Sequence, residues 1–150
     1  MANPNVAARL AHRAALQPER TAIVEYAGGS PRRITFGALA ERVASLSAGM
    51  RETGIGVGDR VLLFVPMSID LYVALLATLH AGATAVFLDA WAGRERLDAA
   101  VAAASPKAFI GSPRAHLLRL VSPAVRSIPV KWIAGRRWAR LARHAHRAAL

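Results

Sequence analysis

The sequence predicts an α/β fold in which a short β-hairpin precedes a parallel β-sheet flanked by helices. Four apolar segments suited to strands begin at residues 61, 84, 107 and 130, so each start lies 23 residues after the one before. That spacing accommodates one strand and one crossover helix, which is the connection that parallel strands require. The length of 150 residues suits one domain, and a hydrophobic share of 54% is enough for a core.

The N-terminal residues predict a helix followed by a β-hairpin. Asn3 and Pro4 form the helix start, because an N-cap residue there precedes a proline at the first helical position. The apolar stripe of this helix repeats every four residues and consists of Val6, Leu10 and Ala14. Residues 21–26 and 32–36 are predicted to form two short strands around a Gly-rich turn.

A long amphipathic helix is predicted next, with Thr35 as its cap. Its single apolar face consists of Leu39, Val43, Leu46 and Met50. Gly54 ends this helix, and the Gly-rich segment 54–60 leads into the sheet. Residues 61–65 are continuously apolar, which is typical of a strand that is buried on both faces.

Helices and strands alternate in the rest of the predicted sheet. The elements are a helix capped by Ser68 that runs to about Leu79, strand 84–88, helix 94–104, strand 107–110, helix 112–121 bounded by Pro123, and strand 130–134. Leu71 to Leu88 is an 18-residue stretch without a formal charge. Because Gly82 interrupts it, a helix followed by a buried strand explains it better than a membrane-spanning helix does.

Charge divides the chain into an α/β domain at 1–134 and a basic amphipathic tail at 135–150. Residues 1–98 carry ten cations and nine acids, whereas residues 99–150 carry ten cations and no acid, giving +11 overall. Three interpretations of the tail stay open: a surface that faced an acidic neighbour in a longer chain, a helix lying on a membrane surface, and non-specific contact with nucleic-acid phosphates. No aromatic residues interleave the arginines as a base-stacking platform would need, so no sequence-specific nucleic acid is expected.

Composition excludes several classes of protein. The chain has no cysteine, which rules out disulfides, cysteine-based zinc or iron–sulfur sites and thiol catalysis. A charged share of only 19% is too low for a disordered chain. Residues 1–20 contain no unbroken apolar stretch of the kind that secretory signals have, so a cytoplasmic protein is expected.

The glycines at 54, 56 and 58 invite comparison with a phosphate-binding loop. Such a loop follows a strand and opens a helix, so that N–H groups at the helix end face the phosphate. Here the order is reversed, because the glycines follow a helix and precede a strand. They are therefore interpreted as a helix stop and a connecting loop.

Candidate acids and histidines do not assemble into a site. No Gly-x-Ser-x-Gly motif is present, and His144 and His146 would point about 200° apart on a helix. The other histidines are isolated in the sequence and are His12, His80 and His116. Asp70 is expected to complement a helix dipole, and Asp89 is the acid best placed for a ligand, at the carboxyl end of a predicted parallel strand. No catalytic, cofactor-binding or metal-binding residue is assigned.

Three short motifs occur in the first 90 residues: ITFGAL at 34–39, GIGVGDRV at 54–61 and LHAGATAVFLD at 79–89. They are similar to the patterns LTYxEL, GVGPGDRV and LKAGxAYVPLD. Together they resemble the opening motifs of the adenylate-forming superfamily of AMP-dependent synthetases and ligases. The match covers residues 5–120; Ala38 departs from it by replacing a glutamate that would complete the helix cap.

The resemblance implies the N-terminal part of the large domain of an acyl-CoA-synthetase-like enzyme, closer to the fatty-acyl branch than to the amino-acid branch. The family's reaction joins a carboxylate to AMP and then forms a thioester, with ATP, magnesium and CoA. The Ser/Thr/Gly-rich ATP loop ending in Pro-Lys-Gly and the later catalytic lysine have no counterpart here. We therefore expect a truncated or split portion that is inactive alone and associates through apolar surface with itself or a complementing chain. The alternative is a non-enzymatic basic interaction module on the same scaffold.

Overall fold

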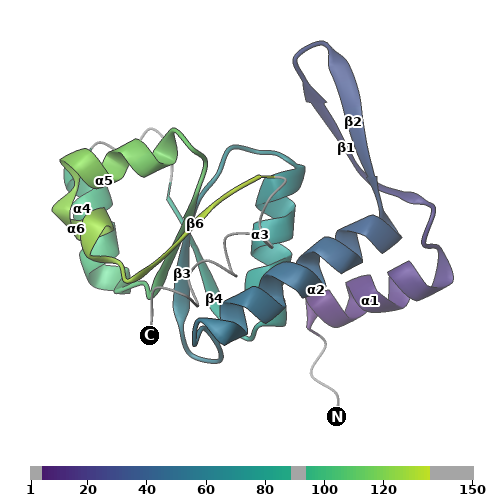
Figure 1. Ribbon diagram of the computed structural model, residues 1–150, viewed down its shortest axis with the longest axis horizontal. Helices are drawn as coiled ribbons and strands as arrows, with labels where there is room; N and C mark the ends of the chain where they lie inside the picture. The colour runs from purple at the N-terminus through teal and green to yellow at the C-terminus, as the bar shows by residue number, and fades with distance from the viewer. Residues whose placement is uncertain (1–4, 89–93, 136–150) are drawn as a thin grey trace.

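The computed structural model describes residues 5–88 and 94–135 and contains two β-sheets (Figure 1). The hairpin strands β1 (Thr21–Ala27) and β2 (Ser30–Thr35) are antiparallel and project away from the rest of the molecule. The second sheet consists of β3 (Arg60–Phe64), β4 (Thr84–Phe87), β5 (Ala108–Gly111) and β6 (Val130–Ile133). Its order is β4-β3-β5-β6 and every neighbouring pair is parallel, which confirms the predicted architecture.

The N-terminal helix α1 (Val6–Leu16) begins later than the sequence indicated. Its N-cap is Asn5, whose Oδ1 accepts a hydrogen bond from the Ala7 N–H at 3.0 Å. Asn3 and Pro4, the predicted start, lie outside the described residues. The predicted stripe was also partly wrong, because Val6 is 55% exposed while Ala7 is buried with Leu10. The contact face therefore keeps Leu10 and the half-buried Ala14, and takes Ala7 in place of Val6.

One face of the sheet is covered by α2 (Phe36–Glu52) and α3 (Ile69–His80), and α1 packs against these two helices. The predicted caps are confirmed, because Thr35 Oγ1 accepts from the Ala38 N–H and Ser68 Oγ accepts from the Leu71 N–H. The predicted apolar face of α2 is entirely buried and consists of Leu39, Val43, Leu46 and Met50. This face packs in one core with Val61 and Leu63 of β3.

The opposite face is covered by α4 (Arg94–Ala104) and three short helical segments. These segments are η1 (Ala115–Leu117), α5 (Leu118–Val121) and α6 (Pro123–Ser127). The single helix predicted over 112–121 was therefore wrong, and Pro123 begins a helix as well as ending one. Ser122 makes this possible by accepting from the Val125 N–H, with proline at the first helical position.

The strand β3 separates the two cores. Val61 and Leu63 belong to the core under α2 and α3, whereas Leu62 packs with Phe109 under α4 and α6. All four of these side chains are at most 1% exposed. The prediction of a strand buried on both faces is therefore confirmed.

The uncharged stretch from Leu71 to Leu88 forms most of α3 and all of β4. Among the described residues, no helix is both long and apolar enough to cross a membrane. The predicted tail at 135–150 lies outside the described residues except for its first position. The cytoplasmic location and the three interpretations of the tail stay predictions.

Candidate functional site

The order of the sheet creates a topological switch at β3. The chain passes from β3 to β4 on one side of it and then returns to β5 on the other side. Because crossovers are right-handed, α3 and α4 lie on opposite faces of the sheet, and the loops that follow β3 and β5 diverge. Ligands of open α/β sheets bind in the crevice that such a divergence leaves at the carboxyl ends of the strands.

A cleft of about 410 Å³ lies at this position. Its lining comes from the ends of β3, β4 and β5 and from the segments that follow, and consists of Phe64, Val65, Pro66, Leu88, Ser112, Arg114, Ala115 and Leu118. Arg114 is the one charged side chain among the described lining residues, and the walls are otherwise almost entirely apolar. The arrangement suits a ligand with an apolar body and an anionic group.

The cleft is held in shape by backbone contacts between its two sides. The Ser112 N–H donates to the Phe64 carbonyl oxygen at 3.2 Å, which joins the chain after β5 to the end of β3. Ser112 Oγ accepts from the Ala115 N–H at 3.2 Å and so fixes the start of η1. Arg114, between these two anchors, is exposed.

The acids singled out in the sequence are not together at this edge. Asp89 lies outside the described residues, although Leu88 before it lines the cleft. Asp70 lies in the first turn of α3, as the helix-dipole interpretation required. Its carboxylate also forms an ion pair with Arg42 on α2, so it ties two helices together.

The histidines are also dispersed. His12 is exposed on α1, and His80 Nδ1 lies 3.0 Å from Ser47 Oγ at the end of α3. His116 Nε2 lies 2.9 Å from the carbonyl oxygen of Trp132. His144 and His146 lie outside the described residues. Within 5–88 and 94–135, no three acid or histidine side chains come together in a group that could hold a metal ion.

The glycine-rich segment lies at the amino edge of the sheet, opposite the cleft, and forms a polar network. Asp59 Oδ2 accepts from the Gly56 N–H at 2.8 Å and from Lys107 Nζ at 3.0 Å. Lys107 Nζ also donates to the Gly54 carbonyl oxygen at 2.6 Å. The Gly56 hydrogen bond, followed by the Lys107 ammonium, lowers the pKa of Asp59 below its ordinary value. The interpretation of these glycines as a connecting loop is confirmed.

The cleft residues Ser112 and Arg114 were missed by the sequence analysis. A signal was present, because Ser112 and Arg114 lie two and four residues after the predicted strand 107–110, near its carboxyl end. The adjacency of β3 and β5 was needed to see that the two loops face one another, and strand spacing does not reveal strand order.

Comparison with known proteins gives consistent results. The family model described as "AMP-binding enzyme" matches residues 10–144. An acetyl-coenzyme A synthetase of Thiobacillus denitrificans is 39% identical over 70 residues, which are 46% of this chain and 11% of that protein. An acetyl-coenzyme A synthetase of Burkholderia lata is 40% identical over 67 residues, or 44% of this chain and 10% of that protein. The match thus spans only about a tenth of the length of these relatives.

Two solved structures share the fold. A benzoate CoA ligase of Burkholderia xenovorans LB400 aligns with a TM-score of 0.76 at 23% identity, over 93% of this chain and 28% of that one. A fatty acid AMP ligase of Legionella pneumophila aligns with a TM-score of 0.73 at 22% identity, over 86% of this chain and 23% of that one. The hairpin and the parallel sheet match the N-terminal domain of adenylate-forming enzymes, and the chain belongs to the AMP-binding enzyme family.

Proposed function

We propose that this chain is the N-terminal α/β portion of an acyl-CoA-synthetase-like ligase and that it performs no adenylation alone. In the parent reaction, a carboxylate attacks the α-phosphate of ATP, pyrophosphate leaves, and the thiol of CoA then displaces AMP. The observation that carries the proposal is the family match over residues 10–144, which leaves little of the chain for an unrelated activity. Acetyl-coenzyme A synthetases among the relatives support CoA as the acceptor.

The residues present do not fit ATP and magnesium. Among the described elements, the glycine-rich loop follows the C-terminal end of α2 and precedes β3, so it does not open a helix whose N–H groups could face a phosphate. The acids that form ion pairs in the described structure each join two segments of the fold, and the pairs are Glu25–Arg32, Asp70–Arg42 and Asp59–Lys107. We therefore assign the chain a scaffold role, in which none of its own side chains takes part in a chemical step.

The switch-point cleft is the place where this scaffold would meet a ligand of the assembled ligase. Its apolar walls and Arg114 suit a molecule with an apolar body and an anionic group. Among the organic reactants of the parent reaction, a fatty or aromatic carboxylate has this character.

The first experiment measures carboxylate-dependent exchange between ATP and pyrophosphate. The purified chain is tested with acetate, benzoate and a series of fatty acids, against a blank without protein. We expect no exchange above the blank with any acid. Exchange above the blank with a single acid would overturn the proposed inactivity.

A chimera tests the scaffold role directly. Residues 36–87, from α2 to β4, replace the matching segment of the Thiobacillus denitrificans acetyl-coenzyme A synthetase. A competent scaffold keeps acetate-dependent exchange within about tenfold of the host enzyme. A second chimera carries Leu62→Asp, which places a charge in the core, and should lose acetate-dependent exchange. A folded, soluble first chimera without activity would contradict the proposal.

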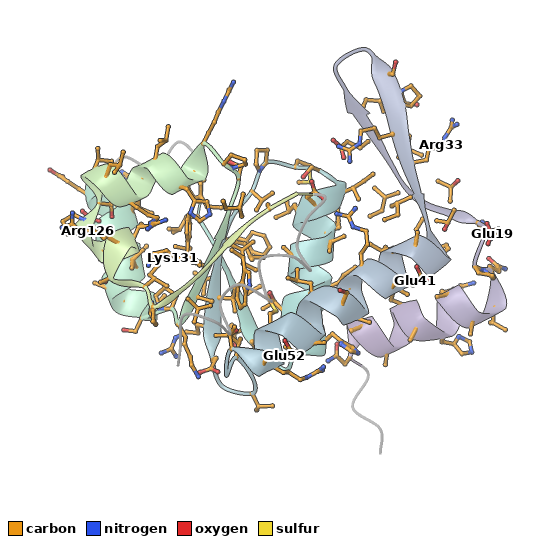
Figure 2. All side chains as sticks on the ribbon, viewed as in Figure 1. Glu19, Arg33, Glu41, Glu52, Arg126 and Lys131 are labelled. Atoms are coloured by element: carbon orange, nitrogen blue, oxygen red, sulfur yellow. The ribbon has the colours of Figure 1, made fainter. Side chains whose placement is uncertain are left out.

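The alternative, a non-enzymatic basic module, is favoured by the charge distribution. Figure 2 shows Glu41 and Glu52 on α2, whereas Arg126 and Lys131 lie on the other side of the molecule, on α6 and β6. An inactive chimera together with salt-sensitive binding of the chain to a polyanion such as heparin would favour this module.

A further inference from the structure

His116 on η1 is held by the sheet through one nitrogen of its ring. Its Nε2 lies 2.9 Å from the carbonyl oxygen of Trp132 on β6. A carbonyl oxygen only accepts, so Nε2 carries the hydrogen and the neutral ring has its lone pair on Nδ1. The ring also lies edge-to-face on Phe109 of β5, with 5.1 Å between ring centroids.

The other nitrogen, Nδ1, is buried and has no hydrogen-bond partner within the part of the chain that the structure describes. A proton added there would create an N–H group without an acceptor and a charge in a partly desolvated place. The charges that act on the ring are both positive, Arg119 on α5 and Lys131 on β6. On the α4 side, the Asp98 carboxylate already accepts from the Ser122 hydroxyl. Among the described residues, no acid forms an ion pair with His116.

These surroundings favour the neutral ring. Burial is the largest effect that lowers the pKa of His116, and the positive charges of Arg119 and Lys131 lower it further. The hydrogen bond to the Trp132 carbonyl acts in the opposite direction and is smaller than the effect of burial. Protonation in the folded state therefore has an unfavourable free energy that the exposed ring of an open segment would not have.

The turn that carries His116 is also one wall of the switch-point cleft. Ala115 and Leu118 line the cleft, while the His116 ring between them contacts β5 and β6. Apolar contacts also hold the wall, because Ala115 is buried in the core with Leu62 and Phe109, and Leu118 packs against that core. In the described structure, the bond from His116 to Trp132 is the one hydrogen bond that joins residues 115–121 to the sheet.

We propose that His116 is a proton-operated latch on this cleft. While the ring is neutral, it holds residues 115–121 against β6 and keeps the wall in place. When Nδ1 takes a proton from solvent, the ring leaves its buried position, the segment detaches from the sheet and the cleft loses one side. The latch acts on the wall itself, so it does not depend on which ligand the cleft takes.

Hydrogen–deuterium exchange of the full chain tests the latch. Peptides from residues 112–121 are compared with peptides from α2, residues 36–52, after correction for the intrinsic pH dependence of exchange. Between about pH 7.5 and about pH 5.5, where histidines change charge, protection of 112–121 should fall by up to about tenfold, the limit for one proton, while α2 keeps its protection. Unchanged protection of 112–121, or an equal loss in both peptides, would overturn the proposal.

Two variants separate the latch from general acid sensitivity. His116→Gln keeps an N–H donor for the Trp132 carbonyl but cannot take up the proton, so its 112–121 protection should no longer depend on pH. His12→Gln removes an exposed imidazole on α1 and should behave as the unaltered chain does. A pH dependence that persists in His116→Gln would refute the latch. If that variant fails to fold, the comparison of 112–121 with α2 in the unaltered chain still decides the question.

Discussion

Lys107 Nζ lies 3.0 Å from Asp59 Oδ2 and so joins the residue before β5 to the residue before β3. The same carboxylate oxygen accepts from the Gly56 N–H within its own loop. Asp59 is thus a junction between the glycine-rich loop and two adjacent strands. This junction lies at the amino edge of the sheet, at the opposite end of the strands from the cleft.

Acid should weaken the fold through Asp59. Because the Gly56 hydrogen bond and Lys107 lower the pKa of Asp59 in the folded chain, the unfolded chain takes up this proton first as pH falls. The stability from Asp59 is complete above the ordinary value of 3.8 and is lost as pH falls through the lowered pKa. Urea unfolding from about pH 7 to about pH 2.5 should therefore show a weaker acid dependence in Asp59→Asn. The matched control is Glu41→Gln, at an exposed position on α2, which should follow the unaltered chain.

Gly82→Ala should destabilise the chain. Gly82 has a φ of +83°, which side-chain-bearing residues adopt at a cost of about 1–3 kcal/mol. An added Cβ would also come within 2.7 Å of Val57 Cγ2. The midpoint of urea unfolding should fall, and Val57→Ala in the same chain should restore only the part that is due to the clash. Gly56→Ala is the control, since a Cβ there meets nothing within 4 Å. An equal effect of the two glycine substitutions would contradict this account.

Truncation to alanine should lower the free energy of unfolding much more at Phe109 than at Phe87. Phe109→Ala removes a fully buried side chain from the core under α4 and α6, which costs about 3–5 kcal/mol. Phe87→Ala removes a side chain that is 51% exposed on β4 and should cost about 1 kcal/mol or less. Urea denaturation followed by circular dichroism measures both. A large loss at Phe87 would mean that the exposed face of β4 is covered in solution.

The exposed apolar surface should cause self-association. Tyr26 and Met67 are 81% and 76% exposed and line one groove between the hairpin and α3, together with Tyr72. Large exposed apolar patches promote association once salt screens the net charge of +11. Light scattering at micromolar concentration should show species larger than a monomer, reduced by Tyr26→Ser with Met67→Ser.

The control for association is Leu16→Ser, at an exposed leucine at the end of α1. This substitution should leave the particle size unchanged. A monomer with a cooperative thermal transition would show that the core is self-sufficient and would favour the stand-alone module over the ligase portion.

Strand spacing and apolar periodicity predicted the long-range architecture because both depend on elements of ordinary length. The four parallel strands and the buried face of α2 follow from patterns that span ten or more residues. The segment 112–127 was mispredicted because α5 has only four residues, too few to show a helical period. Pro123 also permits two outcomes, since it ends one helix and occupies the first turn of another.

The sequence predicted only at which edge of the sheet the candidate site lies. The sequence indicated the carboxyl end of the strands through Asp89, whereas the described cleft takes its one cation from Arg114 after β5. His116 stands alone in the sequence, so no motif indicated a role for it. Its unpaired Nδ1 depends on the packing of β5 and β6 around it, which no local pattern encodes.

The burial of β3 on both faces has a consequence for how the strands find their alignment. A strand with large apolar residues at successive positions can slide by one residue without exposing a polar side chain, so its own pattern does not prevent the error. Polar side chains just before the strands can prevent it, because Lys107 Nζ donates to Asp59 Oδ2 at 3.0 Å and to the Gly54 carbonyl oxygen at 2.6 Å. A redesign that shortened the loop at 54–59 would therefore be expected to misplace both cores at once, although no residue of either core had been changed.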